Sequence, residues 1–435
     1  MRVLLAHRFL PGHFGPLARA LLAAGHEVVF LHQEPGEAPA GARCIKIQPS
    51  RGPAPQTHPY LQSSERAVLL GQAAYRAAHA LREAGFQPEV LVAHSGFGIG
   101  LYLKDAFPRV PLLGLFEWFY RAHGSDADFL PEMRPELDDV LRIRTQNASI
   151  LIELDAVDHG IVPTRFQRSQ FPAAAQAKLE VLHDGVDTRF FHPLPARPDP
   201  SRLRCAGLPQ RVPLVTYATR GLEPYRGFGP FLGALEIVQR ERPDVHAVVA
   251  GKDASFYGRE PPPGTSWAQL ALDAHPGLDR SRLHLVGVLE REDYRCLLRS
   301  SCAHVYLTVP FVLSWSILEA MACAAPVVAS ATPPVEEVAV HGREALLAPF
   351  GGTEAIAEAI LTLLERPQLG AELGAAARAR VVRDYAHETL LPRHLDLLDR
   401  LRLSAAHLAA VISSGSRTSR RSIDGLQSLL VSSVR

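Results

Sequence analysis

Short apolar segments alternate with helix-type patterns along most of this chain, and this alternation limits the folds available to it. A strand, a helix and a second strand form the repeating unit of parallel β-sheets, because neighbouring parallel strands need a crossover connection. The first half has strand candidates at Val3–Ala6, Glu27–Leu31, Val90–Ala93, Leu112–Phe116 and Glu180–His183, and helix candidates at Gly15–Ala24, Ser64–Ala84 and Pro135–Ala156.

A second series of the same kind begins after a proline-rich stretch, Pro193–Pro213, which disfavours regular helix or strand and predicts a linker. The pattern therefore predicts an α/β protein with two Rossmann-like domains that face each other across a cleft. The strand candidates of the second series are Val215–Thr219, Val245–Gly251, His284–Val288, His304–Val309 and Pro326–Ala329.

Helical patterns continue after Ala355 almost to His407, with expected interruptions at Pro367 and Pro392. The last segment is rich in Ser and Arg and has little to bury, so it is expected to be disordered. The expected division is a first domain at 1–195, a linker at 196–211, a second domain at 212–385, a helix at 386–410 and a tail at 411–435.

Composition excludes several classes of function. The formal net charge is +1, so no bulk electrostatic field recruits nucleic acid or an anionic membrane. The five cysteines are scattered without a CxxC pair, which argues against a zinc ribbon or a disulfide framework. No apolar run reaches the length of a membrane span, and the N-terminal apolar run is too short for a signal peptide. We therefore expect a cytoplasmic protein without a transmembrane segment.

The segment Pro310–Ser330 is the strongest functional signal in the chain. It predicts a loop, a short helix around Glu319 and the strand that begins at Pro326. Ser314 and Ser316 near the helix start would help its backbone N–H groups meet an anion, and Glu319 could accept hydrogen bonds from ribose hydroxyls. These residues predict a nucleotide-diphosphate pocket; the alternative is a buried helix that tolerates one acid.

Four segments in order resemble family 4 retaining glycosyltransferases of the GT-B fold. LEAMACAAPVVAS (Leu318–Ser330) resembles the donor-site signature of that family, and VLHDGVDTRFFHP (Val181–Pro193) its segment at the end of the first domain. TRGLEPYRGF (Thr219–Phe228) resembles its phosphate segment, and Gly12–Leu31 its opening glycine loop and helix. The resemblance implies a GT-B fold whose last helices cross back to the first domain. It also implies transfer from a nucleotide-diphospho-sugar without a metal or other cofactor.

The same resemblance assigns roles to individual residues. Arg220 and Arg226, at the end of a second-domain strand, would neutralise the diphosphate, because arginine makes permanently charged, bidentate contacts with phosphate oxygens. Gly12 and Gly15 would let the first loop approach the leaving group closely. His13 in that loop is equally compatible with ligand contact and with exposure to solvent. Asp126-Ala-Asp128 matches the DxD pattern of metal-dependent transferases but lies in a polar segment, so it is interpreted as a chance match.

Two departures from the family pattern concern the sugar. The family has a second carboxylate eight residues before the Glu319 position, and Phe311 stands there. The family has a histidine near the reactive carbon of the sugar, and the matching position is Glu117. Glu117 and His94 are our candidates for contacts to the donor sugar or the acceptor, and Trp315 could add a stacking face, although a large aromatic side chain is more often part of a core.

These observations predict a retaining glycosyltransferase that uses a UDP- or GDP-sugar and a saccharide or lipid-linked acceptor. Polysaccharide or cell-envelope assembly is the expected pathway class, and peripheral association with a membrane stays open. The alternatives are a sugar-nucleotide epimerase or a glycosyl phosphorylase on the same fold, or a catalytically silent protein that binds a nucleotide or scaffolds a pathway.

Overall fold

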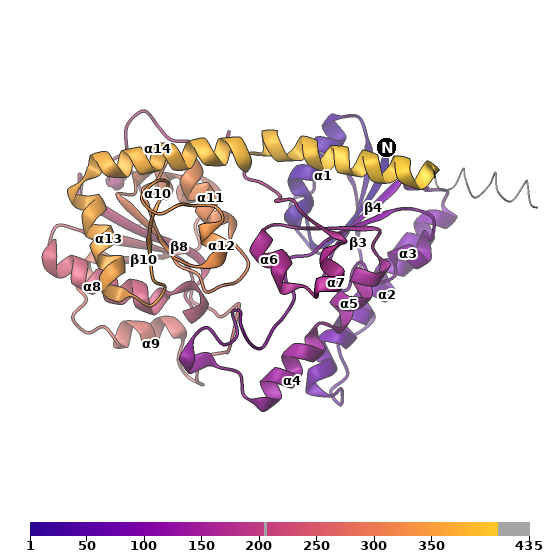
Figure 1. Cartoon of the computed structure of the whole chain (residues 1–435), viewed down its shortest axis with the longest axis horizontal. Helices are drawn as coiled ribbons and strands as arrows, with labels where there is room; N and C mark the ends of the chain where they lie inside the picture. The colour runs from indigo at the N-terminus through magenta and orange to yellow at the C-terminus, as the bar shows by residue number, and fades with distance from the viewer. Residues whose placement is uncertain (204–206, 408–435) are drawn as a thin grey trace, which may run out of the picture.

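The computed structural model describes residues 1–203 and 207–407, and they form two halves, each built on a parallel sheet (Figure 1). The first sheet has the strand order β3-β2-β1-β4-β5-β6-β7 and the second the order β10-β9-β8-β11-β12-β13, and every strand pair is parallel. The strands are β1 (Arg2–Phe9), β2 (Glu27–Glu34), β3 (Arg43–Lys46), β4 (Val90–His94), β5 (Leu112–Leu115), β6 (His159–Val162), β7 (Leu179–Val181), β8 (Leu214–Gly221), β9 (His246–Lys252), β10 (Leu283–Gly287), β11 (Ala303–Tyr306), β12 (Val327–Ser330) and β13 (Leu346–Ala348).

Helices connect the strands and cover both faces of each sheet, as parallel pairing requires. The predicted α/β architecture with two Rossmann-like domains is therefore confirmed. The helices are α1 (Gly15–Ala23), α2 (Gln62–Glu83), α3 (Leu103–Ala106), α4 (Leu137–Gln146), α5 (Ala148–Ala156), α6 (Arg165–Gln170), α7 (Ala173–Gln176), α8 (Phe228–Glu241), α9 (Trp267–Asp273), α10 (Arg291–Ser300), α11 (Trp315–Ala322), α12 (Pro333–Glu336), α13 (Thr353–Glu365) and α14 (Pro367–Asp384).

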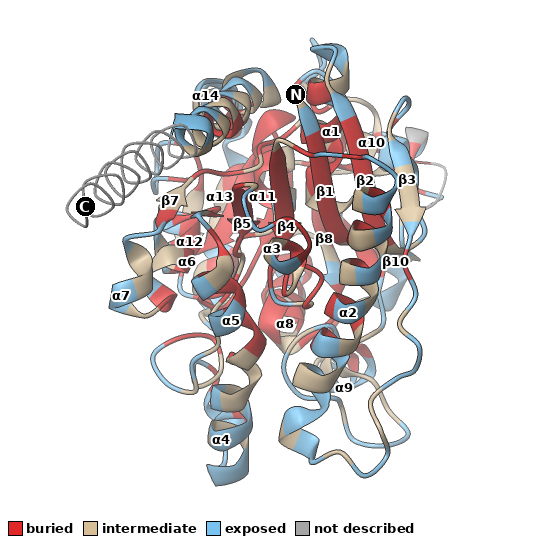
Figure 2. Ribbon diagram, turned by 90° about the vertical axis from the view of Figure 1, so that its right-hand side faces the viewer, coloured by how far each residue is buried: buried red, intermediate tan, exposed pale blue. Residues whose placement is uncertain are grey.

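Strand β1 shows how the sequence pattern produces two cores in one sheet. Its central residues are fully buried and are red in Figure 2. Successive side chains of a strand point to opposite faces of the sheet. Val3 and Leu5 join the cluster that includes α1, whereas Leu4 and Ala6 join the cluster that includes α2. A strand buried on both faces reads as a continuous apolar run, which is why it was recognisable in the sequence.

Some predicted boundaries were wrong for identifiable reasons. The helix predicted over 135–156 is two helices, α4 and α5, which meet at Asn147. The side chain of Asn147 binds the backbone of Tyr120: its Oδ1 accepts from the amide at 2.9 Å, and its Nδ2 donates to the carbonyl at 2.8 Å. This contact with a distant segment explains the division. Strands β3, β6 and β13 were not predicted. Strands β3 and β13 lie at sheet edges and are only partly buried, and β6 begins with His159 and Gly160, which shorten its apolar run. The proline-rich linker contains one 3₁₀ turn, Pro200–Arg202.

The C-terminal helices cross from the second half back to the first (Figure 1). After α14 the chain pairs briefly with the first half through the Val186–Ala386 bridge, and residues 387–407 are helical. The interruption expected at Pro392 was wrong: the break lies at Tyr385–Ala386 instead. Pro392 removes one helical hydrogen bond, and burial of Leu390, Leu397 and Leu398 in the first-half core offsets that loss. The predicted tail, 411–435, lies outside the described residues.

None of the described helices combines the length and the apolar character that crossing a bilayer requires.

The returning helix gives the first prediction. Leu398 is fully buried and Leu403, on the same helix, is 58% exposed. We expect Leu398→Ala to lower the free energy of unfolding by about 2–5 kcal/mol, because it leaves a cavity in the first-half core. Leu403→Ala is the matched control, and its effect should stay within about 0.5 kcal/mol. Urea denaturation measures both; equal effects would contradict the packing of this helix on the first half.

Candidate active site

A cavity of about 920 Å³ lies between the two halves, at the carboxyl ends of strands from both sheets. Ligands of open α/β sheets bind at that edge, because the loops that follow the strands meet there. Of the site residues expected from the sequence, Gly15 and Glu319 do not line the cavity. Those that do are Gly12, His94, Glu117, Arg220, Arg226, Ser314, Trp315 and Ser316.

Arg220 lies at the end of β8 and Arg226 in the turn that follows it, and they reach the cavity in different ways. Arg226 is buried; its Nη1 donates to Thr308 Oγ1 at 2.8 Å, and its guanidinium lies 5.2 Å from the Tyr257 ring centre. Arg220 lies over the Phe256 ring at 4.2 Å. Neither arginine has a carboxylate within 4.0 Å among the described residues. Aromatic faces hold a cation without neutralising it, so both charges remain available to an anion.

Glu223 fixes the loop that supplies these two aromatic rings. Its Oε2 accepts from the backbone amides of Phe256 and Tyr257 at 2.6 and 3.0 Å. Burial raises the pKa of this carboxyl, and the two amides and the charges of Arg226 and Arg220 act in the opposite direction. Glu223 is therefore a support for the arginine turn rather than a ligand group, and the sequence analysis did not single it out.

The start of α11 faces the cavity, but part of its donor set is already used. Ser314 is the N-cap, and its Oγ accepts from the Ser316 amide at 3.3 Å. The Trp315 indole Nε1 donates to Asp184 Oδ2 at 2.8 Å, and its ring centre lies 4.8 Å from that of His13. Trp315 thus links α11 to the first half across the cavity.

Glu319 lies one turn further along α11 and faces α10 instead of the cavity. Burial raises its pKa to about 7, although the neighbouring Tyr294 and Arg291 act in the opposite direction. A carboxyl with this pKa is present in both its neutral and its ionised form near pH 7. A contact between Glu319 and a ribose stays a prediction. That contact would require a shift of α11, or a ligand that extends past the residues that line the cavity.

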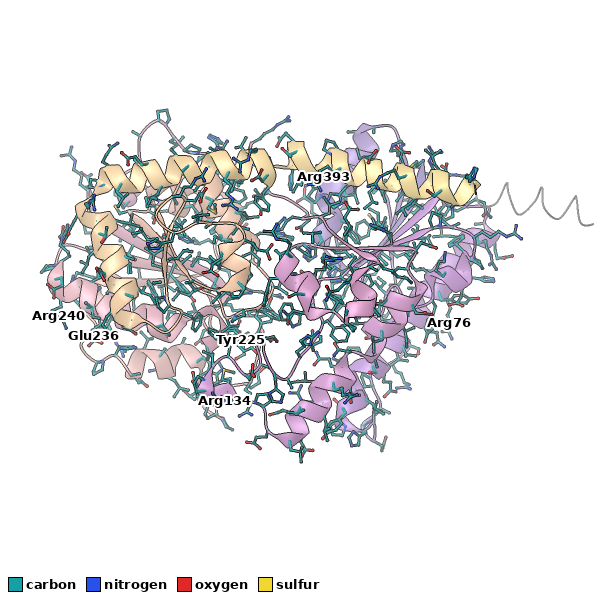
Figure 3. All side chains as sticks on the ribbon, viewed as in Figure 1. Arg76, Arg134, Tyr225, Glu236, Arg240 and Arg393 are labelled. Atoms are coloured by element: carbon teal, nitrogen blue, oxygen red, sulfur yellow. The ribbon has the colours of Figure 1, made fainter. Side chains whose placement is uncertain are left out.

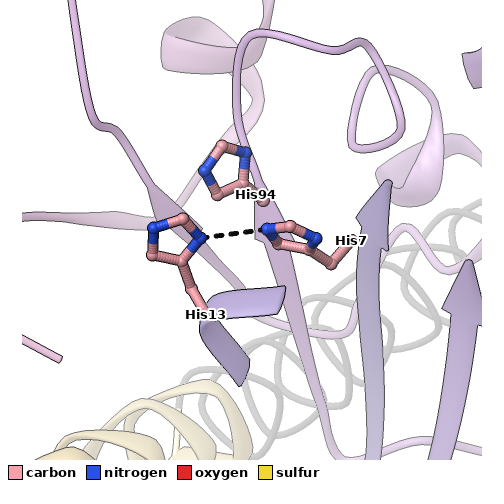
Figure 4. Close-up of side chains that lie close together, drawn as sticks. All are labelled: His7, His13 and His94. Atoms are coloured by element: carbon pink, nitrogen blue, oxygen red, sulfur yellow. Dashed lines mark hydrogen bonds between the residues drawn. The ribbon is translucent and has the colours of Figure 1, made fainter. Parts of the chain in front are cut away.

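Glu117 joins two histidines on the first-half wall of the cavity. Its Oε2 accepts from His94 Nε2 at 2.9 Å, and its Oε1 lies 3.1 Å from His13 Nε2. His7 Nε2 lies 3.1 Å from His13 Nδ1 (Figure 4). These residues come from β1, the loop after it, the end of β4 and the residues after β5, so the sheet edge gathers them from distant positions.

Electrostatics divides the cluster into charged and neutral members. Burial alone would raise the pKa of Glu117, but the charges and hydrogen bonds of His13 and His94 hold it well below its usual range. Burial opposes the charge on His13, yet the charge and hydrogen bond of Glu117 raise its pKa to about 9. Burial and the two neighbouring histidines lower the pKa of His7 to about 2, and burial lowers that of His94. The cluster therefore holds an ionised Glu117–His13 pair beside neutral His7 and His94 at pH 7.

The sequence analysis named His94 and Glu117 as candidates for contacts to the donor sugar or the acceptor, left the position of His13 open and did not single out His7. A positive φ of +52° at Gly12 brings the loop so close to His7 that a Cβ there would lie 2.2 Å from the imidazole ring. That close approach brings His13 to Glu117. It depends on tertiary contact, and the sequence signal was only a glycine next to a histidine after an apolar strand.

Two groups of residues bear on metal binding. One nitrogen from each of His7, His13 and His94 lies within 4.8 Å of the others, so these three residues could hold a metal ion. In the present arrangement the His13 and His94 rings stack at 28° and both contact Glu117, which suits proton sharing. In the DxD-like segment, Asp128 accepts from the Gly124 amide and Asp126 accepts from the Tyr225 hydroxyl at 3.0 Å.

Aromatic rings from both halves surround Phe311, the position where the family resemblance predicts a carboxylate. The ring centres of Trp118, Tyr257 and Tyr225 lie 4.8, 5.0 and 5.8 Å from that of Phe311. Tyr225 is labelled in Figure 3, where it lies between the two halves. This end of the cavity is therefore apolar, with one carboxyl, Asp126, already hydrogen-bonded to Tyr225.

The chain matches two family models, one for each half. Residues 24–191 match the model described as "Glycosyl transferase family 4 group", and residues 212–366 match "Glycosyl transferases group 1". The chain belongs to the family 4 glycosyltransferases. The resemblance found in the sequence is confirmed at the level of the family.

A relative and two solved structures extend this comparison. The α-maltose-1-phosphate synthase of Mycolicibacterium smegmatis is 28% identical over 235 residues, which are 52% of this chain and 58% of that relative. The sucrose-phosphate synthase of Thermosynechococcus elongatus superposes with a TM-score of 0.69 at 17% identity, over 93% of this chain and 100% of that one. Anabaena HepE, solved with UDP and glucose, has a TM-score of 0.66 at 17% identity, over 92% and 100%. These structures confirm the GT-B fold.

The Glu117–His13 pair predicts a pH dependence of stability. A histidine pKa raised in the folded protein contributes stability that is complete below about pH 6.5 and is lost as pH rises through about 9. We expect the free energy of unfolding to fall between pH 7 and pH 9.5, and Glu117→Gln to abolish this fall. NMR titration of His13 should give a midpoint near 9 in the wild type and a lower one in the variant.

Glu180→Gln is the matched control, since it removes the carboxyl of another His–Glu contact, His159–Glu180, whose atoms lie 3.2 Å apart away from the cavity. It should leave the His13 titration in place. A wild-type midpoint near 6.5 would contradict the ionised pair.

Proposed function

We propose that this glycosyltransferase transfers a sugar from a UDP-sugar with retention of anomeric configuration, without a metal ion, in polysaccharide or glycoconjugate biosynthesis. The observation that carries the proposal is the pair Arg220 and Arg226, two cations that face one cavity without a carboxylate partner among the described residues. Negative charge develops on the diphosphate as it leaves, and fixed cations stabilise that charge.

First-half groups complete the environment of the leaving group. The His13 imidazolium lies on the opposite wall, beside Trp315 at the start of α11. Its pairing with Glu117 keeps it charged at neutral pH. The Glu117 carboxylate balances the charge of His13, so a diphosphate between the halves would meet its unpaired positive charge on the arginine wall, and closure of the cleft would strengthen those contacts.

The chemistry of the transfer follows from these positions. The bond between the anomeric carbon and the UDP oxygen breaks, and a bond from that carbon to an acceptor hydroxyl oxygen forms on the same face. The acceptor proton passes to the released diphosphate. In this proposal neither Glu117 nor His94 acts as a nucleophile; they hydrogen-bond the donor sugar or orient the acceptor.

The choice of UDP is supported by the HepE structures, which were solved with UDP and glucose and with UDP-glucose. The cytoplasm is the expected site of action, because the scattered cysteines fit a reducing compartment.

A thermal-shift screen against UDP, GDP and ADP tests the donor pocket. At about 100 times the dissociation constant, a nucleotide should stabilise the protein by roughly 2.7 kcal/mol and raise the melting temperature. We expect UDP to do so in the wild type and in Arg240→Ala, and Arg220→Ala to lose most of the shift. Arg240 is an exposed arginine of α8 whose nearest carboxylate is Glu241, far from the cavity (Figure 3). The absence of a shift with every nucleotide would contradict the proposal.

Product analysis separates the transferase from its alternatives. Release of UDP that depends on an added acceptor is expected. A changed donor sugar without an acceptor indicates an epimerase, and phosphate-dependent cleavage of a glycoside indicates a phosphorylase. UDP binding without hydrolysis or transfer indicates the silent protein, the alternative that Phe311 and Glu117 first suggested.

A further inference from the structure

The end of β1 carries an arginine that faces the cavity and has one long, partly exposed contact with a carboxylate. Arg8 lines the cavity, and the Glu34 carboxylate lies 3.7 Å from its Nη2, with both side chains about a third exposed. Its Nε is buried and has no hydrogen-bond partner among the described residues. A guanidinium offers five N–H donors in a planar fork that matches a phosphate group. Arg8 therefore has unused capacity for an anion.

Two phenylalanines hold this guanidinium in place. Its central carbon lies 5.2 Å from the ring centre of Phe9 and 5.4 Å from that of Phe97, and the two rings meet edge to face at 5.8 Å. Phe9 is 37% exposed. The rings orient the cation and leave its charge unneutralised. Together they form a surface with an apolar face and a positive charge, which suits a ligand that combines a sugar ring with an anionic group.

This surface continues directly into the Glu117 cluster. The Phe97 ring stacks on His94 at 5.2 Å with an interplanar angle of 20°, and His94 is bound to Glu117. Arg8 thus lies on the first-half wall, beyond His94, whereas Arg220 and Arg226 lie on the second-half wall. A ligand with its anionic group on Arg8 and its ring against Phe97 would direct a hydroxyl toward His94 and Glu117.

We propose that the acceptor is a phosphorylated carbohydrate, whose phosphate binds Arg8 and whose sugar ring contacts Phe9 and Phe97. This inference rests on the proposed transferase function and names the acceptor class for the same site. The acceptor phosphate is unchanged by the reaction; only the hydroxyl near His94 forms the new glycosidic bond. The phosphate belongs either to a free sugar phosphate or to a lipid-phosphate-linked sugar, and both present the same chemistry to Arg8.

Calorimetric titration of UDP-saturated protein tests this proposal, because bound UDP prevents sugar phosphates from occupying the diphosphate site. The ligands are glucose 6-phosphate, fructose 6-phosphate, glucose, fructose and an undecaprenyl-diphosphate-linked sugar in detergent micelles. We expect at least one phosphorylated ligand to bind roughly 10- to 100-fold more tightly than its neutral counterpart, as charge-assisted hydrogen bonds predict. Binding of the free sugar phosphates identifies a soluble acceptor, and binding of the lipid ligand alone identifies a lipid-linked one.

Three variants assign the effect to Arg8. Arg8→Ala should remove the preference for phosphorylated ligands, and the UDP-dependent rise in melting temperature checks that it is folded. Glu34→Gln should tighten phosphate binding by a few fold, because it removes the competing carboxylate, and a merely structural Arg8 would not give this gain. Arg2→Ala is the matched control on the same strand, and Arg2 does not line the cavity.

Equal affinity for neutral and phosphorylated ligands, or an unchanged preference in Arg8→Ala, would overturn the proposal about the acceptor. Failure of the wild type to bind any nucleotide in the thermal-shift screen would instead contradict the proposed transferase function.

Discussion

The contacts of the ionised Glu117 with charged His13 and neutral His94 organise the first-half wall of the cavity. They join the loop after β1, the end of β4 and the segment after β5, three pieces of chain that no local interaction would hold together. A carboxylate in a partly buried site is costly unless charged or hydrogen-bonded groups surround it, and here two imidazoles do so. Removal of Glu117 would leave His13 without the partner that keeps it charged.

Consequences of these contacts extend across the cavity. His13 packs against Trp315, and Trp315 is hydrogen-bonded to Asp184 at the junction between the halves. His94 stacks on Phe97, which in turn lies beside Arg8. One carboxylate therefore positions a cation that faces the second half and an aromatic surface that faces the proposed acceptor. The second-half wall depends on a separate support, because Glu223 binds the amides of the loop that carries Phe256 and Tyr257.

Strands that are buried on both faces were the easiest elements to predict from the sequence. Strands such as β1 and β9 are apolar on both faces, and they were recognisable because a strand buried between two helix layers excludes polar residues. Strand β6 has only two apolar residues, Ile161 and Val162, after His159 and Gly160, so its sequence shows no strand pattern. The division of 135–156 at Asn147 was invisible, because the cause is a hydrogen bond to Tyr120, a residue from a different segment.

The sequence by itself determined the α/β class, the family and the arginine turn after β8, because these depend on local periodicity and on motifs of adjacent residues. Tertiary structure decided which groups share the cavity. It brought His7 and His13 to Glu117, turned Glu319 toward α10 and surrounded Phe311 with rings from both halves. Those outcomes depend on distances between residues far apart in the chain, and only the packing of the two sheets and their loops sets such distances.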